Sequence, residues 1–229
     1  MNYKVKILMT EFVTHNVKRF ILEKPSGYKF EPGQATDVSI NHKGWENNKH
    51  PFTFTSLNEH LVLEFTIKGY PVEKYPDHEG VTEKLHKLVP GDELLLEDPW
   101  GTINYMGKGT FFAGGAGITP FIAILRQLKK DRKISGHSLI FSNKLKEDVI
   151  LEKEFRNMFS EVNSKLVLTL TREKVSGYEY GRIDEGMVKK YINEYSQHFY
   201  VCGPKQFVAD IKEILKKLGA SSNTLVFEE

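Results

Sequence analysis

The chain contains a single cysteine, Cys202, among its 229 residues. One thiol cannot form an intrachain disulfide, and it cannot supply the ligands of a zinc ribbon or of a cysteine-bound iron–sulfur cluster. The 8 histidines are scattered and show none of the paired spacings that bind a metal ion. We therefore expect no metal centre in this chain, and a thiol without a disulfide partner is typical of the cytoplasm.

Charge of one sign and long apolar runs are also lacking. The 32 Lys and Arg nearly balance the 30 Asp and Glu, and a net charge of +2 creates no field that would favour nucleic acid or a membrane surface. The most apolar stretch, residues 111–125, holds three glycines and a proline and is too short to cross a bilayer. Residues 1–12 alternate charged and apolar side chains, unlike a signal peptide. We expect a soluble cytoplasmic monomer that binds neither nucleic acid nor membrane.

The first half of the chain has apolar residues at every second position. In residues 61–68, LVLEFTIK, Leu61, Leu63, Phe65 and Ile67 share one face, which predicts a half-buried strand. Turns built on proline and glycine separate such segments, a spacing that predicts an antiparallel barrel or sandwich. These turns lie at residues 25–27, 31–33, 43–44 and 90–92.

The second half alternates short apolar runs with segments whose apolar residues recur every three or four positions. The runs TFFAGG, SLIFSN, KLVLTLT and HFYVCG are predicted as buried strands. Parallel strands need crossover helices, so we predict an open, doubly wound sheet with ligands at the carboxyl ends of its strands. We place the boundary between the two domains after residue 104, giving domains 1–104 and 105–229.

A glycine-rich turn, GGAGITP, follows the first of these runs at residues 114–120. Its glycines let a ligand approach the backbone, Thr119 can cap the helix that follows, and Pro120 suits the first helical position. Free amides at such a helix start attract the phosphates of a dinucleotide. A tight connection without a ligand is the alternative, and Pro120 replaces the third glycine of the common G-x-G-x-x-G pattern.

This turn, preceded by an all-β half and followed by YVCGP at residues 200–204, resembles the ferredoxin-NADP reductase superfamily of flavin-dependent oxidoreductases. The resemblance spans nearly the whole chain. It implies an antiparallel FAD-binding β-barrel followed by a doubly wound, parallel-sheet NAD(P)-binding domain. It further implies hydride transfer from NAD(P)H to bound FAD, then single electrons to a small carrier: flavodoxin, ferredoxin or an oxygenase component. A non-catalytic flavoprotein subunit and a ferric-chelate reductase are the alternatives.

The resemblance assigns the flavin site to residues 50–56, HPFTFTS, through the family pattern R-x-Y-[ST]-x-x-S. Phe52 takes the tyrosine position and would lie against the flavin, and Thr53 would place its hydroxyl near the flavin N5. A plain core strand with solvent-facing hydroxyls is the alternative. The motif residues that the resemblance assigns to the cofactor are His50, Pro51, Phe52, Thr53 and Ser56.

His50 departs from the family arginine. An imidazole offers at most two hydrogen-bond donors where a guanidinium offers five, so phosphate binding through this position should be weaker. Lys49 and Lys68 are candidates to compensate, although neither stands in the matching position.

A second flavin element of the family is a G-x-x-[ST] helix start. Gly80, Val81 and Thr82 precede a predicted helix here, with the hydroxyl one place earlier than in the pattern. By resemblance, the amides of Val81 and Thr82 would receive the pyrophosphate. A capping box built on Thr82 is the alternative.

The resemblance places the nicotinamide nucleotide on the second domain. Thr171 and Arg172 follow a predicted parallel strand and would contact a 2′-phosphate, which favours NADPH slightly over NADH. Asn143 and Lys144 are expected in the same pocket, and an exposed loop arginine is the alternative for Arg172. The remaining nucleotide contacts implied by the family are Gly115, Gly117, Thr119, Pro120, Cys202, Gly203 and Pro204.

Three residues are implied to lie closest to the reacting atoms: Thr53, Cys202 and Glu228. Cys202 would border the nicotinamide, with a small buried thiol as the alternative. Glu228 matches a carboxylate near the family's C-terminus, and Phe227 is the candidate shield for the flavin.

The basic stretch 129–133 is interpreted as a solvated helix end, with docking of an acidic electron carrier as the alternative.

Overall fold

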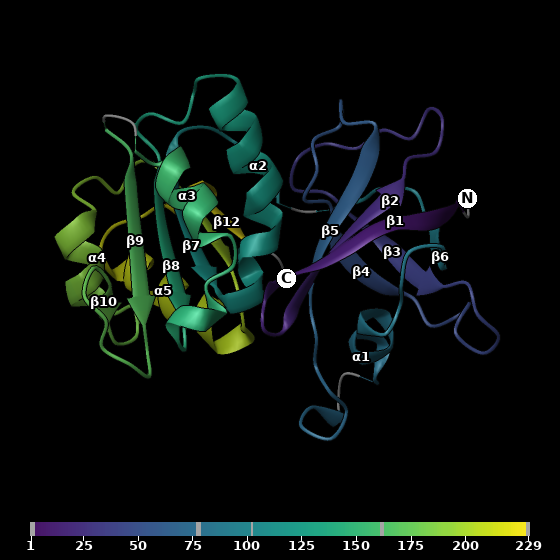
Figure 1. Ribbon diagram of the computed structural model, residues 1–229. Helices are drawn as coiled ribbons and strands as arrows, with labels where there is room; N and C mark the ends of the chain where they lie inside the picture. The colour runs from purple at the N-terminus through teal and green to yellow at the C-terminus, as the bar shows by residue number, and fades with distance from the viewer. Residues whose placement is uncertain (1–2, 77–78, 102, 161–162, 228–229) are drawn as a thin grey trace. The chain divides into compact units, whose positions relative to one another are not determined.

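The computed structural model describes residues 3–76, 79–101, 103–160 and 163–227 (Figure 1). Its contacts divide the chain into two compact units, residues 1–101 and 102–229, which we call the barrel unit and the α/β unit. Each unit contains one six-stranded sheet. Among the described residues, none of the helices is long and apolar enough to cross a membrane.

The barrel unit is an antiparallel sheet with the strand order β4-β3-β6-β1-β2-β5. An isolated bridge between Phe54 and Phe65 joins the chain just after β4 to β5 at the opposite edge, so the sheet closes on itself. Aromatic side chains fill the interior, where the Phe54 ring stacks on Phe30 at 4.2 Å between centroids. The elements are β1 (Tyr3–Thr14), β2 (Val17–Glu23), β3 (Ala35–Ile40), β4 (His50–Thr53), β5 (Val62–Lys68), α1 (Val81–His86) and β6 (Glu93–Leu96).

Strand β5 corrects the sequence prediction of a half-buried strand. Leu61 is 92% exposed and precedes the strand, while Glu64 and Thr66 on the supposedly solvated face are buried. Their burial has a polar cause, because the Thr55 hydroxyl donates to Glu64 Oε1 at 2.7 Å and lies 3.2 Å from the Thr66 hydroxyl. The segment that contains Thr55 therefore covers the face of β5 that the alternating pattern predicted to be exposed to water.

The α/β unit is a parallel sheet with the strand order β10-β9-β8-β7-β11-β12. All four predicted strands are present as β7, β8, β9 and β11, and the predicted fold class is confirmed. The elements are β7 (Gly109–Gly114), η2 (Gly115–Ile118), α2 (Thr119–Lys130), β8 (Ser138–Asn143), η3 (Lys146–Asp148), α3 (Glu152–Met158), β9 (Lys165–Leu170), β10 (Glu179–Tyr180), α4 (Glu185–Tyr191), β11 (His198–Cys202), α5 (Lys205–Lys217), η4 (Ser222–Thr224) and β12 (Leu225–Phe227).

Helices cover both faces of this sheet (Figure 1). Phe111 and Phe112 are consecutive in β7 and point to opposite faces, as the pleat of a strand requires. Phe111 packs edge-on against Phe121 of α2, whereas Phe112 joins a cluster with Val188 of α4 and Ile211 of α5. The double covering leaves the carboxyl ends of the central strands as the place where loops gather.

Candidate active site

The glycine-rich turn lies at the carboxyl end of β7, the strand between β8 and β11. Gly115 to Ile118 form a single 3₁₀ turn, and α2 begins at Thr119. The prediction that Thr119 caps the helix is wrong, because Ile118 occupies the cap position and the Thr119 hydroxyl donates to the Ala116 carbonyl at 3.0 Å. Pro120 lies in the first helical turn as predicted, and it is buried.

The glycines of this turn serve different purposes. Gly115 has φ of 55°, and no atom lies within 4 Å of the position that a Cβ would take, so its backbone faces open space. A Cβ on Gly117 would instead lie 2.4 Å from the Cys202 carbonyl oxygen and 2.5 Å from the Gly203 nitrogen. The missing side chain of Gly117 therefore allows two backbone segments to meet. This packing does not bear on the phosphate contact predicted for Gly117, which stays a prediction.

Gly114 and Gly203 complete this packing. A Cβ on Gly203 would lie 3.1 Å from the Gly114 Cα, and one on Gly114 would lie 3.1 Å from the Pro204 ring. Pro204 is the N-cap residue of α5, and its carbonyl accepts from the Val208 amide at 3.1 Å. The structure thus brings the two predicted nucleotide segments, 114–120 and 202–204, into direct backbone contact, with Cys202 buried at the end of β11.

Thr171 and Arg172 follow β9, two strands from β7 along the same edge of the sheet. Their amides donate to the carbonyls of Asn143 and Lys144, each at 3.0 Å, which ties the end of β9 to the end of β8. The Arg172 side chain is exposed and has no polar partner among the described residues. The nearby carboxylate of Glu173 accepts from the Lys146 amide and is therefore engaged.

Asn143 closes β8 between the glycine turn and Thr171. Its side chain is 5% exposed, and neither Oδ1 nor Nδ2 has a hydrogen-bond partner among the residues that the structure describes. A buried polar group left unpaired costs about 1–3 kcal/mol. Such an orphaned amide at the carboxyl edge fits a site that gains polar partners when a ligand binds.

In the barrel unit, helix α1 begins with backbone amides that no capping side chain satisfies. Gly80 is the N-cap with φ of 75° and makes no side-chain cap hydrogen bond, so the first-turn amides lack acceptors within the helix. The Thr82 hydroxyl accepts from the Tyr70 amide at 3.0 Å, which excludes the alternative of a Thr82 capping box. Val81 is buried, so only its backbone could meet a ligand.

His50 stands close to this helix start. Its Nε2 lies 2.9 Å from Asn48 Oδ1 and 4.0 Å from Glu79 Oε2, and Glu79 directly precedes Gly80. The structure thus brings the first residue of the HPFTFTS motif to the predicted pyrophosphate site. Glu79 is a residue that the sequence analysis missed, and its negative charge beside that site opposes an anion.

The sequence suggested that the motif HPFTFTS forms one strand, but the strand covers only part of it. Only His50 to Thr53 belong to β4, and the next residue, Phe54, forms an isolated bridge to Phe65 of β5. Phe52 is half-buried and packs against the barrel core, while Pro51 is exposed and Thr53 is half-buried. Ser56 is 1% exposed, and its hydroxyl accepts from the Glu64 amide at 3.0 Å, so its placement does not support the predicted cofactor contact.

Lys68 ends β5 next to a pair of tyrosines. Its Nζ lies 5.9 Å from the Tyr70 ring centroid, and the Tyr70 ring packs edge-on against Tyr75 at 5.1 Å. Burial raises the pKa of the Tyr70 phenol. Tyr70 is a second residue that the sequence analysis missed, although its place between a strand and the Gly80 helix start could have drawn attention to it.

Glu228, predicted as catalytic, lies outside the described residues. Phe227 precedes it and is the last residue of β12, opposite Val201 in the parallel register. The Lys212 ammonium from α5 lies 3.3 Å from the centroid of the Phe227 ring.

Comparison with known proteins assigns a family to each unit. A family model described as an FAD-binding domain matches residues 2–101, and one described as an oxidoreductase NAD-binding domain matches residues 111–213. NADH-cytochrome b5 reductase 2 of Rattus norvegicus is 27% identical over 97% of this chain and 93% of its own length. The reductase component of propane 2-monooxygenase from Rhodococcus jostii is 23% identical over 90% of this chain and 57% of its own.

A solved structure supports the same fold. A ferredoxin NADP⁺ reductase from Neisseria gonorrhoeae, solved with FAD and NADP, superposes with a TM-score of 0.85 at 20% identity, covering 99% of this chain and 98% of its own. The two domain models stand in the order that the sequence predicted, one on each unit. The chain belongs to the ferredoxin-NADP reductase superfamily and is an FAD- and NAD(P)H-dependent oxidoreductase.

Proposed function

We propose that this oxidoreductase passes the electrons of NADPH, and less readily those of NADH, to a one-electron carrier protein on a separate chain. A single cysteine cannot hold an iron–sulfur cluster, so a carrier centre of that kind would belong to a partner. Relatives named as a cytochrome b5 reductase and as the reductase component of a monooxygenase support a redox partner on a separate chain. Ferredoxin, flavodoxin and an oxygenase component are the carriers we consider.

The observation that carries the proposal is the close backbone contact between the two glycine-containing loops, 114–120 and 202–204, at the carboxyl edge of the sheet in the α/β unit. The close backbone contact of Gly117 with Cys202 fixes two loops side by side, while the open Gly115 leaves room for a ligand above them. We assign the dinucleotide phosphates to the Gly115 backbone and the Thr119 helix start, where helix amides favour anions. We assign the nicotinamide to the border formed by Cys202, Gly203 and Pro204.

We assign the flavin to the barrel unit. The free amides of Val81 and Thr82 at the Gly80 helix start would hold its pyrophosphate, with His50 beside Glu79 and Lys68 beside Tyr70 as candidate donors. Phe52 and Thr53 would line the ring. A bound flavin supplies a hydride acceptor that releases electrons singly, so these residues need only bind, orient and exclude water.

The preference for NADPH depends on Arg172. Its exposed guanidinium is free of polar partners among the described residues and suits a 2′-phosphate, which prefers a charged, forked donor. The acidic residue beside it, Glu173, is engaged by the Lys146 amide and is not free to accept from a 2′-hydroxyl. We further place the protein in the cytoplasm as a monomer, which light scattering on the purified chain would test.

Stopped-flow mixing of the yellow protein with NADPH and NADH, without oxygen, tests both assignments. We expect both nucleotides to bleach the flavin and NADPH to be faster by about tenfold, the worth of one charge-assisted contact. Arg172→Gln should remove this preference, whereas Lys174→Gln, which changes a neighbouring cation packed on Tyr180, should retain it. No bleaching by either nucleotide would refute the oxidoreductase, and an unchanged preference in Arg172→Gln would refute only the 2′-phosphate assignment.

A further inference from the structure

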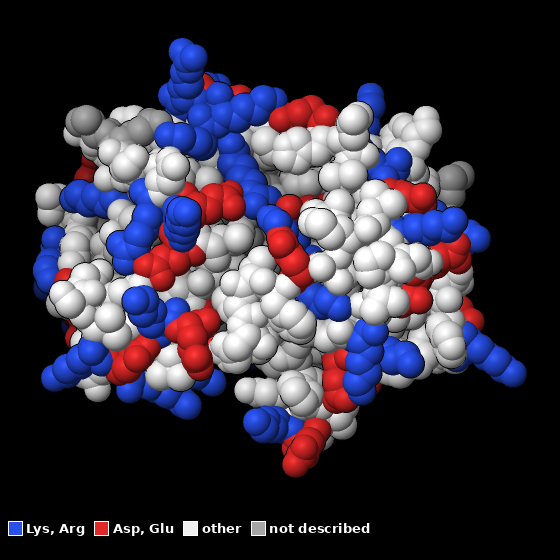
Figure 2. Space-filling view, viewed as in Figure 1, with Lys and Arg blue, Asp and Glu red and all other residues white. Residues whose placement is uncertain are grey.

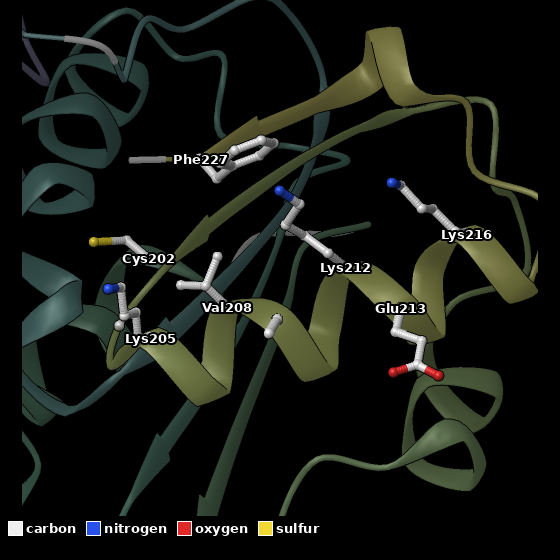
Figure 3. A pocket seen from close by; sticks show the side chains of 9 residues that line it. Cys202, Lys205, Val208, Lys212, Glu213, Lys216 and Phe227 are labelled. Carbon is white, nitrogen blue, oxygen red and sulfur yellow. The ribbon is translucent and has the colours of Figure 1, made fainter. Parts of the chain in front are cut away.

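A groove runs along helix α5 in the α/β unit, beside the edge strand β12 (Figure 3). It has a volume of about 910 Å³. One end lies at Cys202, and from there the groove follows the helix for most of its length. The lining residues that matter here are Cys202, Lys205, Val208, Lys212, Lys216 and Phe227.

The charge of this groove is unbalanced. Lys205, Lys212 and Lys216 have no carboxylate partner among the described residues. By contrast, Lys217 on the same helix is neutralised by Glu185 at 2.5 Å. Glu213 also borders the groove, but its carboxylate points away from Lys212 and Lys216 (Figure 3). Three positive charges therefore face the groove without compensation.

The floor of the groove is apolar. Val208 and Phe227 are half-buried, and the Lys212 ammonium lies over the Phe227 ring at 3.3 Å from its centroid. A cation held on an aromatic face loses less conformational freedom when it meets an anion than a lysine that moves freely in water. An apolar floor with a charged rim is the composition of a protein interface.

We propose that this groove docks an acidic surface of the one-electron carrier, an inference that rests on the proposed function for the existence of that carrier. Lys205 and Lys216 are eleven positions apart on α5, a separation of about 16 Å at 1.5 Å per helical residue. A small anion would reach one or two of these ammonium groups, whereas a row of carboxylates on a protein surface reaches all three. The size and charge of the groove therefore favour a protein partner.

A competing surface lies at the end of α2, where residues 129–133 carry four cations and Figure 2 shows Lys and Arg side chains gathered. Cations at that position are explained by the negative end of the helix dipole. Asp131 interrupts the row and accepts from Gln127 at 2.9 Å, and Leu128 beside it is buried. This surface lacks the apolar floor that the α5 groove has, so we favour the groove.

Two triple variants separate the two surfaces. Lys205→Gln, Lys212→Gln and Lys216→Gln together neutralise the groove, and Lys129→Gln, Lys130→Gln and Lys133→Gln together form the matched control. Steady-state reduction of the soluble acidic haem domain of cytochrome b5 is measured at low and high salt, with ferricyanide as a small acceptor that needs no docking. We expect the groove variant to raise KM for the cytochrome about tenfold at low salt, and the difference to shrink at high salt because ions screen exposed charges. Ferricyanide reduction and flavin bleaching by NADPH should stay within about twofold of the unmodified chain, since neither needs the rim charges.

Binding of a fluorescent polyglutamate peptide, measured in parallel, needs no turnover. We expect the unmodified chain and the α2 variant to bind this peptide at low salt, and the groove variant to lose binding. Equal binding by all three proteins, or a loss confined to the α2 variant, would overturn the groove. Slower bleaching by NADPH in the groove variant would also overturn it, because the lysines would then serve the nucleotide. Failure of NADPH to bleach the unmodified chain would refute the proposed function alone and leave the peptide to judge the groove.

Discussion

The barrel unit builds its candidate site from hydrogen bonds made by side chains, whereas the α/β unit builds its site from glycines that lack side chains. In the barrel, the Thr82 hydroxyl accepts a hydrogen bond from the Tyr70 amide, and the Asn48 side chain hydrogen-bonds to His50. In the α/β unit, Gly117 lies against the backbone of Cys202 and Gly203. The first arrangement uses atoms at the ends of side chains, and the second uses the main chain itself.

This difference predicts different tolerance to substitution. A side-chain hydrogen bond contributes about 0.5–1.5 kcal/mol, and neighbouring groups can rotate when it is lost. A main-chain contact has no rotamer to change, so an added atom must push one loop away from the other. We therefore expect single substitutions to damage the α/β site more severely than the barrel site.

Gly117→Ala is the strongest test of that expectation. The added methyl group would lie 2.4 Å from the Cys202 carbonyl oxygen, so the turn after β7 must move away from the end of β11. A displacement of about 1 Å in a substrate-positioning element costs about 100-fold in rate. We expect the rate of flavin bleaching by NADPH to fall by about that factor, measured by stopped flow.

Gly115→Ala is the matched control two residues away. No protein atom lies within 4 Å of its Cβ position, so the only cost to the fold is the left-handed φ of 55°, about 1–2 kcal/mol for a residue with a side chain. Bleaching is compared at saturating NADPH, because the methyl group would also occupy space that we assign to the phosphates. We expect a smaller rate loss, with the protein still folded by circular dichroism. If the two variants behaved alike, the close contact between the loops would not be the cause, and the contrast between the units would fail.

Lys18→Met probes the side-chain arrangement of the barrel. Lys18 is buried, and its ammonium donates to the carbonyls of His86 and Leu88 at 3.0 and 2.8 Å, where helix α1 ends. Methionine preserves the packing on Phe20 but leaves both carbonyls without this donor, at a cost of about 1–3 kcal/mol. Burial lowers the pKa of the Lys18 ammonium, and the charge of Asp92 opposes that shift.

Urea unfolding followed by tryptophan fluorescence measures this loss. Both tryptophans, Trp45 and Trp100, belong to the barrel unit, so their emission reports on that unit alone. The exposed Lys29→Met is the control and should leave the midpoint unchanged. A Lys18→Met barrel as stable as the unmodified one would show that the buried ammonium contributes nothing net.

The α/β unit was predictable from sequence because its signals are local. GGAGITP and YVCGP each lie within seven residues, and the strands that precede them are continuous apolar runs. Parallel topology then brings their carboxyl ends to one edge without further information. The role of Gly117 could not be predicted in this way, because the atoms it contacts are 85 residues away in the sequence.

The barrel site was less predictable because its contacts join distant segments. The motif HPFTFTS suggested one continuous strand, but β4 ends at Thr53, and Phe54 pairs with Phe65 of β5 only through an isolated bridge. The Ser56 hydroxyl is buried and accepts from the Glu64 amide, and Glu79, which lies close to His50, belongs to a separate loop. Period-two alternation cannot show that a second layer of chain covers β5, so the burial of Glu64 went unforeseen.

The smallest expected effect concerns His86, which is half-buried at the end of α1. Its Nε2 lies 2.9 Å from the Ile67 carbonyl, its ring packs edge-on against Phe12, and the charged Lys18 is nearby. Burial lowers the pKa of this imidazole below its ordinary value of 6.5, and Lys18 lowers it further. In the unfolded chain the ring binds a proton near pH 6.5, while in the folded barrel it stays neutral to lower pH.

The unfolded state therefore binds more protons in this window, and the free energy of unfolding of the barrel should fall as the pH drops below about 6.5. His86→Gln keeps a donor for the Ile67 carbonyl and removes the titration, so its stability should fall less between pH 7.5 and 5.5. The exposed His42→Gln should behave like the unmodified chain. His137 in the α/β unit also has a pKa lowered by burial, but the tryptophans report only on the barrel, so His137 does not enter the measurement. An equal loss of stability in all three proteins would mean that the acid sensitivity of the barrel comes from other groups, and that folding does not lower the pKa of His86.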